Sequence, residues 1–352
     1  KLLLDRGADI DFARDYINTK VLSHLFMLQG VIDIYTPENT FIELALEGFI
    51  LEFTLSAIHN SLLRFLNHYS ARSLRPYFRY IRVAADALGG AAELMHYQQY
   101  NTDLKSHSAR IRFLLSQQPL LVPLAYEGHA VSFVQYGETW VRCDRGEYGR
   151  EHGCINVGKI GNPEVISPDF FSHLIYTKQT RVFVTDQLDQ VLGVQPVEQI
   201  PISEQTAGNC SWANIEASIP AILYLLFSRA KSLHAFGPDH HKQTAIDIFN
   251  AWRTWQQDIA IEECIESFET ANRARKASKA ALLGTILMQQ SHFNDFDSIK
   301  RVDKIVEILN LEDHRYILQS YYDAYCKPKP TPGGQNLIDV LEAHGVDPDQ
   351  FK

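Results

Sequence analysis

Four residues in the middle third of the chain carry the side chains that thiol chemistry needs. Cys210 follows a polar turn and precedes the apolar run Ile215 to Phe227, which predicts a buried helix. A thiol at a helix N-terminus lies near the positive end of the helix dipole, which favours the thiolate, the form that attacks carbonyl carbon. Gln205, five residues before the cysteine, has an amide N–H that can face a developing oxyanion.

A base for this cysteine is expected upstream, at one end of a β-hairpin. Residues 129–136 alternate apolar and polar side chains, Gly137-Glu138 is a turn, and residues 139–144 form a second strand. His129 opens the first strand and Asp144 closes the second, so antiparallel pairing places both at the same end of the sheet. Asp144 then orients the imidazole, whose other nitrogen faces the cysteine.

The chain order of these four residues resembles a known enzyme clan. A His, an Asp at the end of the next strand, and a Gln shortly before a helix-borne Cys are typical of the clan of adenain and the SUMO proteases, which also includes effector acetyltransferases. The resemblance covers roughly residues 115–227. It implies that His129 is the base, Asp144 its orienting partner, Gln205 the oxyanion donor and Cys210 the nucleophile. Papain-like enzymes place Cys before His, so the order disfavours them.

The sequence departs from the clan at two points. The usual Asp-Cys-Gly around the nucleophile is Asn209-Cys210-Ser211 here, and the usual His-Trp is His129-Ala130. Taken singly, a Cys before an apolar helix is often a small buried hydrophobe, and an Asp before Gly is often a turn residue. Three functions therefore stay open: a cysteine peptidase acting on protein or ubiquitin-like conjugates, an acyltransferase on the same triad, and a catalytically inactive interaction scaffold.

The first residues carry a second resemblance. Lys1 to Asp11 is similar to the closing helix and loop of an ankyrin repeat: leucines end the helix, Gly7 makes the turn, and Ala-Asp-Ile-Asp follows. A lone repeat cannot bury its own face, so we expect the chain to be the C-terminal part of a longer protein with further repeats upstream. Leu337 to Pro348 is similar to such a tail, although a plain capped helix followed by Pro is the preferred interpretation.

The two features together resemble the ankyrin-repeat effectors that intracellular bacteria inject into host cells. This resemblance implies a host protein as partner, bound through the ankyrin repeats. It also implies delivery by a dedicated secretion system into the host cytoplasm or nucleus. The five cysteines are odd in number and scattered, which favours reduced thiols in a reducing compartment.

Composition and motifs exclude several other classes. The chain has 352 residues, 45% hydrophobic and 21% charged, as in an ordinary globular protein, and its net charge of −9 disfavours nucleic-acid binding. No uncharged apolar run reaches about 18 residues, so we predict no membrane span. His240-His241 and His152-x-Cys154 lack the paired spacing of a zinc site, and no phosphate or dinucleotide fingerprint occurs, so we expect no metal and no cofactor.

The patterns predict an α+β fold in which a cysteine-protease-like domain with a small mixed sheet lies between helical regions. Five segments are expected: the end of the ankyrin region with the following helices (1–60), a helical connector (61–112), the protease-like domain (113–235), a helical region (236–326), and a linker with a terminal helix (327–352). Within them we predict helices at Phe41 to Phe53, at Pro76 to Gln99 with a break at Gly89-Gly90, and after Ser167-Pro168-Asp169, and further strands at Leu120 to Tyr126 and Arg181 to Thr185.

Overall fold

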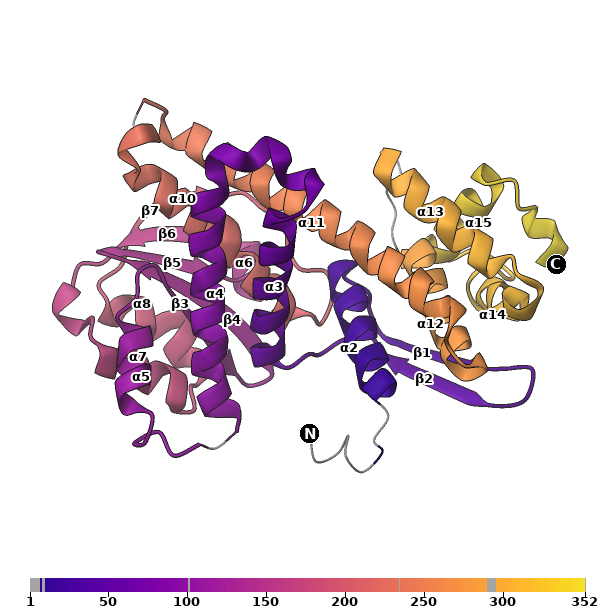
Figure 1. Cartoon of the computed structure of the whole chain (residues 1–352), viewed down its shortest axis with the longest axis horizontal. Helices are drawn as coiled ribbons and strands as arrows, with labels where there is room; N and C mark the ends of the chain where they lie inside the picture. Colours follow the sequence, from indigo (N-terminus) through magenta and orange to yellow (C-terminus); the bar gives the residue numbers. More distant parts are fainter. Residues whose placement is uncertain (1–6, 8–9, 101, 234, 290–295, 352) are drawn as a thin grey trace. The chain divides into compact units, whose positions relative to one another are not determined.

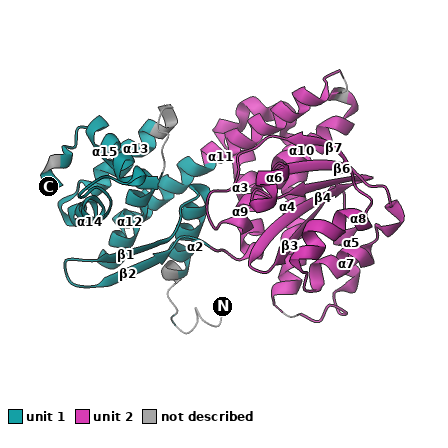
Figure 2. Ribbon diagram, turned by 180° about the vertical axis from the view of Figure 1, so that it is seen from behind, with its two compact units in different colours: residues 1–47, 256–352 teal, residues 48–255 magenta. Residues whose placement is uncertain are grey.

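The protein divides into two compact units in the computed structural model, which describes residues 7, 10–100, 102–233, 235–289 and 296–351. Unit 1 combines residues 1–47 with residues 256–352, and unit 2 is residues 48–255 (Figure 2). This division differs from the five consecutive segments expected from the sequence. The helix and hairpin within residues 10–45 contact a helix within residues 273–289, and such an association between distant segments leaves no trace in local composition.

Unit 2 is built on one sheet and the helices that cover it (Figure 1). Its elements are α3 (Leu51–Leu66), η1 (Tyr69–Tyr77), α4 (Phe78–Gln99), α5 (Ser108–Leu115), β3 (Leu120–Tyr126), β4 (His129–Tyr136), β5 (Thr139–Cys143), α6 (Glu147–His152), β6 (Ile155–Lys159), η2 (Pro163–Val165), α7 (Pro168–Tyr176), η3 (Phe183–Gln187), α8 (Leu188–Val191), β7 (Gln195–Ile200), α9 (Cys210–Glu216), α10 (Ser218–Arg229), η4 (Lys231–Leu233) and the first part of α11 (Pro238–Glu269).

The five strands form an antiparallel meander in the order β3-β4-β5-β6-β7. The strands predicted at the start of this sheet are confirmed. The expectation of a mixed sheet is wrong, because each strand pairs with the next one in the chain, and the tight turns of β3-β4-β5 allow only antiparallel pairing. In the β4–β5 pair, Ser132 lies opposite Cys143, so β4 extends past β5 to His129.

The helices α9 and α10 supply much of the core of unit 2 by packing on β4 and β5. The stretch Cys210–Arg229 is long and apolar enough to cross a membrane by length and composition, but 94% of its most apolar window is buried inside the structure. That degree of burial is typical of the core helix of a folded domain. Elsewhere, α4 contacts α3 on one side and β3 on another.

Unit 1 pairs a helix and a hairpin with a group of C-terminal helices. Its elements are α2 (Ile10–Leu25), β1 (Val31–Tyr35), β2 (Phe41–Ala45), the last part of α11, α12 (Arg273–Gln289), α13 (Phe296–Leu309), η5 (Glu312–His314), α14 (Arg315–Tyr325), α15 (Pro332–Ala343) and η6 (Pro348–Phe351). The helix α12 contacts both α2 and the hairpin and also packs on α13, α14 and α15.

Two predictions of local secondary structure are wrong. The apolar stretch from Phe41 forms β2 and not a helix, since Ile42 is buried against β1 in the hairpin while α3 begins only at Leu51. Residues 181–191 are helical, not a strand, and the Thr180 hydroxyl accepts the Phe183 N–H at the start of that helical segment.

The helix α4 continues through Gly89-Gly90, where a break was predicted. A Cβ at position 89 would lie 3.0 Å from the ring of His59, so this glycine permits close packing of α3 and α4. By contrast, the predicted start of α7 is confirmed, with the Ser167 hydroxyl accepting the Phe170 N–H.

The ankyrin-like segment Lys1 to Asp11 lies almost entirely outside the described residues. Within it the structure describes Gly7, with a positive φ of 81°, and the start of α2. At the other end of the chain, the preferred interpretation of residues 337–348 is confirmed: α15 begins at Pro332 with Thr331 as its cap and ends before Gly345, whose φ is 74°.

Candidate active site

The hairpin and α9 bring His129, Asp144 and Cys210 together at one end of the sheet. His129 is the first residue of β4, Asp144 directly follows β5, and Cys210 is the first residue of α9. Since α9 packs on β4, the start of this helix meets the start of that strand. Three of the four residues predicted from the sequence therefore form one cluster.

A buried carboxylate holds the imidazole. The Nε2 atom of His129 lies 3.2 Å from Oδ1 and 3.3 Å from Oδ2 of Asp144, whose side chain is 1% exposed. The Gly146 N–H donates to the same Oδ1 over 2.9 Å. A Cβ at position 146 would lie 2.9 Å from Cε1 of His129, so only glycine leaves the ring in this place. With Nε2 turned to the carboxylate, Nδ1 is the nitrogen left for the thiol.

The electrostatics of the cluster favour a charged pair. Burial raises the pKa of the Cys210 thiol, but hydrogen bonds from His129 and from the Ala130 N–H, 3.3 Å from the sulfur, outweigh burial and hold the pKa below its ordinary value. Burial likewise opposes charge on His129, yet the hydrogen bonds and charges of Asp144 and Cys210 raise the pKa of the imidazole to about 9. Both pKa shifts therefore favour the charged forms, a thiolate beside an imidazolium.

Asn214 ties the nucleophile helix to both other elements. Its side-chain amide N–H donates to the Ala130 carbonyl oxygen over 2.6 Å, and its side-chain oxygen accepts the Arg145 N–H over 2.7 Å. The Ser132 hydroxyl adds a third bond by donating to the Asn214 carbonyl oxygen over 2.6 Å. All of these groups are buried, so the relative positions of Cys210 and the hairpin depend on a fully satisfied polar network.

Arg145 anchors the loop that contains the fourth predicted residue. Its buried guanidinium pairs with Glu216 of α9 and donates to the Ser203 carbonyl oxygen over 2.7 Å, while its own carbonyl oxygen accepts the Gln205 N–H over 2.8 Å. Sequence reasoning missed Asn214, Arg145 and Gly146 as positioning residues. The one local signal was that these residues lie within four positions of Cys210 or Asp144 in the sequence. Such spacing indicates a positioning role only when the packing of the helix on the hairpin is known.

The predicted oxyanion donor is engaged elsewhere. The Gln205 amide N–H donates to the Ala207 carbonyl oxygen over 2.6 Å, and its Oε1 is buried with no hydrogen-bond partner in the described part of the chain. The side chain of Asn209, directly before the nucleophile, is also buried, and neither of its amide atoms has a partner there. Both residues precede the start of α9, and each has a buried side-chain oxygen without a hydrogen-bond partner in the described part of the chain.

A cleft of about 380 Å³ opens on the His129–Asp144 side of the cluster. Besides these two residues, its lining is rich in carboxylates and aromatic side chains: Tyr126, Glu127, Glu147, Tyr148, Glu151, His152, Arg181, Thr185 and Asp186. The edge of one ring meets the face of the other between Tyr126 and His129, with centroids 5.4 Å apart. Burial, followed by the charge of Asp144, raises the pKa of Tyr126 to about 12, so its hydroxyl stays protonated.

His152, His240 and His241 were considered as metal ligands in the sequence, and the structure groups none of them with enough further ligands for a metal site among the described residues. Within the described residues, no group of three or more His, Cys, Asp or Glu side chains is arranged to hold a metal ion. All five cysteines are free thiols, and Cys210 is the one that is not fully buried.

One solved structure decides the family. The structure of AnkH, an effector of Legionella, is 41% identical in sequence and superposes with a TM-score of 0.84, over 99% of this chain and 73% of the AnkH chain. This chain belongs to the AnkH family. No family model matches the chain, and neither does any curated protein.

Membership of the AnkH family confirms the coarse expectation from the sequence, a bacterial effector with an α+β fold. The similarity supports secretion into a host cell, where an effector acts on host components. Ankyrin-mediated binding and thiol chemistry stay predictions, and the chemistry depends on the geometry described above.

Proposed function

We propose that this AnkH-family protein is an effector whose unit 2 is a thiol peptidase acting on protein or ubiquitin-like conjugates inside the host cell. One observation carries the proposal: the imidazole of His129 is hydrogen-bonded to the buried carboxylate of Asp144, and the sulfur of Cys210 lies 3.3 Å from the N–H of Ala130, the residue next to His129. A base held by a third group beside a nucleophile is the arrangement that activates a thiol for acyl transfer.

The chemistry would run in two steps. The Cys210 thiolate attacks the scissile carbonyl carbon, forming a C–S bond while the carbonyl π electrons move to oxygen. As the tetrahedral intermediate collapses, the His129 imidazolium gives its proton to the leaving amine, and the C–N bond breaks. Water then attacks the thioester while His129 takes a proton from it, which releases the acid and restores the thiolate–imidazolium pair.

The start of α9 would stabilise the oxyanion. The Cys210 backbone N–H has no hydrogen-bond acceptor among the described residues. This is expected for the first N–H of a helix. Gln205 would add its amide N–H after rotating away from the Ala207 carbonyl oxygen. Since that rotation breaks an existing hydrogen bond, substrate binding has to compensate for it.

The engaged Gln205 amide also favours a second candidate, a catalytically inactive scaffold that presents a protein-binding surface. An acyltransferase would use the same first step and differ in the second, where a lysine or hydroxyl in place of water accepts the acyl group. Ankyrin-mediated binding of a host protein belongs to both candidates, and its support is the ankyrin-like pattern of residues 1–11. Five reduced thiols agree with action in a reducing compartment.

The deciding experiment uses ubiquitin and SUMO with electrophilic C-terminal groups, a proteome-derived peptide mixture, and acetyl-coenzyme A with a lysine-rich protein. We expect a covalent adduct or peptide cleavage with the wild type and with Cys264→Ala, and neither with Cys210→Ala. Acetyl-lysine formed only by the wild type and Cys264→Ala would instead assign acyl transfer. If all three proteins are silent in every arm, unit 2 is a scaffold.

A further inference from the structure

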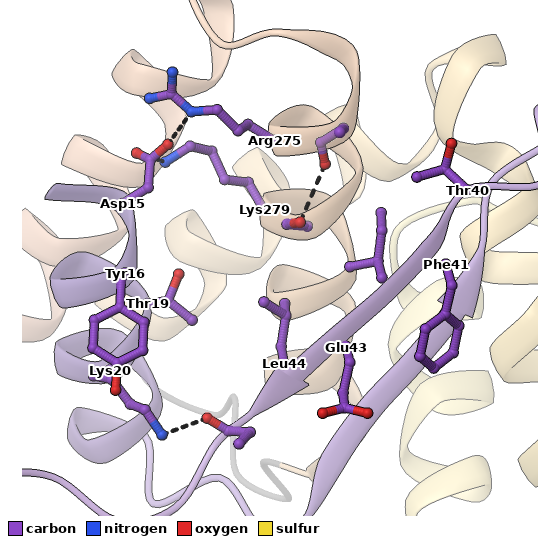
Figure 3. A pocket seen from close by; sticks show the side chains of 14 residues that line it. Asp15, Tyr16, Thr19, Lys20, Thr40, Phe41, Glu43, Leu44, Arg275 and Lys279 are labelled. Atoms are coloured by element: carbon purple, nitrogen blue, oxygen red, sulfur yellow. Dashed lines mark hydrogen bonds and ion pairs between the residues drawn. The ribbon is translucent and has the colours of Figure 1, made fainter. Parts of the chain in front are cut away.

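Unit 1 contains a pocket of about 400 Å³ whose lining shares no residue with the thiol cluster (Figure 3). Three elements line it: α2 on one side, the strand β2 on the other, and α12 between them. Most of its surface is apolar, and the aromatic rings of Tyr16 and Phe41 stand at its rim, 55% and 48% exposed. The pocket therefore offers apolar surface to a ligand that can reach it from solvent.

One wall of the pocket is the open edge of a two-stranded sheet. Hydrogen bonds from the Leu46 N–H to the Gly30 carbonyl oxygen and from the Thr36 N–H to the Thr40 carbonyl oxygen set the alternation of the ladder. In an antiparallel pair, bonded and non-bonded residues alternate. It follows that the N–H and C=O groups of Ile42 and Leu44 point to β1, while those of Phe41, Glu43 and Ala45 point away from it.

The position of Lys20 confirms this direction. Its ammonium group, on α2 across the pocket, donates to the Ala45 carbonyl oxygen over 2.6 Å. The outward groups of β2 therefore face the pocket. In the described part of the chain, the backbone groups of Phe41 and Glu43 have no hydrogen-bond partner. An edge that presents unpaired donors and acceptors is a template for another strand.

The charges of the lining select among possible strands. Three cations and two carboxylates face the pocket, a net charge of +1 in a chain whose net charge is −9: Lys20, Arg275, Lys279, Asp15 and Glu43. Asp15 pairs with both Arg275 and Lys279, so these three residues together keep a net charge of +1. A segment with an acidic residue fits this lining better than a basic one.

We propose that this pocket binds an extended segment of a partner protein by strand addition to β2. The backbone of the segment pairs with the outward N–H and C=O groups of Phe41 and Glu43. An aliphatic side chain of the segment fills the apolar space over Leu44 and Ser278, and an acidic one lies near Arg275 and Lys279. Main-chain pairing supplies affinity in this mode, and the pockets for alternate side chains supply selectivity.

Backbone N-methylation gives a direct test with the full chain. The probe is the blocked peptide acetyl-Glu-Val-Thr-Val-Thr-amide, titrated calorimetrically, with two analogues methylated on opposite sets of alternate amides. Because only one edge of an added strand pairs with β2, we expect one analogue to bind at least about tenfold more weakly than the other, from the loss of two backbone hydrogen bonds. Equal affinity of the two analogues, or no binding of the parent peptide, would overturn the proposal.

Two matched proline variants separate the two edges of the hairpin. Glu43→Pro removes an N–H of β2 that points away from β1 and makes no hydrogen bond to it. Edge strands tolerate such a proline. Asp33→Pro is the control, because Asp33 lies opposite Glu43 and its N–H points away on the far edge of β1. Circular dichroism and thermal unfolding report whether both variants keep the fold.

We expect Glu43→Pro to weaken peptide binding about tenfold and Asp33→Pro to leave it unchanged. Cys210→Ala should also bind the peptide like the wild type, so this result is independent of the proposed peptidase. If both folded proline variants bind alike, or if the chain forms a dimer that Glu43→Pro abolishes, the edge does not serve a partner segment as proposed.

Discussion

The side-chain amide of Asn214 donates to the carbonyl oxygen of Ala130 over 2.6 Å. Asn214 lies one helical turn after the nucleophile Cys210, and Ala130 directly follows the base His129. This single hydrogen bond therefore joins the two elements whose separation sets the distance between sulfur and imidazole. Both partners are buried, so neither can exchange its bond for water.

Asn214→Ala should destabilise the protein and disorganise the candidate site. The substitution leaves the Ala130 carbonyl oxygen and the Arg145 N–H buried without a partner, which costs about 2–4 kcal/mol. Urea unfolding measures the loss, and the rate of iodoacetamide modification of Cys210 measures the geometry. The control is Ser132→Ala, which removes one buried hydrogen bond of the same interface and should cost about 1 kcal/mol with little effect on that rate. Equal alkylation rates in all three proteins would show that Asn214 does not position the cysteine.

Gly146→Ala should impair the site without unfolding the protein. An added Cβ would lie 2.9 Å from Cε1 of His129 and 3.2 Å from Oδ1 of Asp144, so the ring must move off the carboxylate. We expect the pKa of His129 to fall towards 6.5, which proton NMR of the imidazole can follow. Gly90→Ala is the matched control. Position 90 lies in the middle of α4, and a Cβ added there would make an ordinary 3.7 Å contact with Leu114. That change should stabilise the protein by about 0.5–1 kcal/mol; an unshifted His129 in Gly146→Ala would contradict the assigned contact.

Cys210 should react with iodoacetamide near neutral pH much faster than the other four cysteines. Its pKa is held below the ordinary value, whereas burial raises the pKa of Cys143, Cys154, Cys264 and Cys326. Cys143 is fully buried on its strand and should react last. Peptide mass spectrometry after a brief exposure gives the order. Uniform labelling, or Cys210 appearing last, argues against an activated thiolate.

The raised pKa of His129 should also make the free energy of unfolding depend on pH. Because the folded pKa of His129 is raised from 6.5 to about 9, the imidazolium contributes stability that is complete below pH 6.5 and is lost as the pH rises through about 9. The difference in unfolding free energy between the wild type and His129→Gln should therefore be larger at pH 6 than at pH 10. Denaturant titrations at the two pH values measure it. A difference that grows with pH would reverse the assignment of charge, and any hydrolysis should likewise decline above pH 9 as the proton donor is lost.

The local pattern of the sequence determined where the three reactive side chains begin or end their elements. A two-residue turn between alternating segments sets the β4–β5 register, so His129 and Asp144 had to share one end of the sheet. The apolar run after Cys210 required a helix that starts at the thiol. These inferences were accessible because each rests on neighbours within a few residues, and hydrophobic periodicity reports such neighbours directly.

Only the tertiary structure decided what holds the cluster together and what surrounds it. The bond from Asn214 to Ala130 spans 84 positions of the chain, and the hairpin of unit 1 packs on α12 more than 200 positions away. No local period encodes such distant partners. The stretch from Phe41 was wrongly predicted as a helix for this reason: its side chains suit either period, and burial against β1 and α12 selects the strand. The spacing of residues predicted Cys210 as a nucleophile, but only the packing of α9 on β4 brings that thiol close to His129.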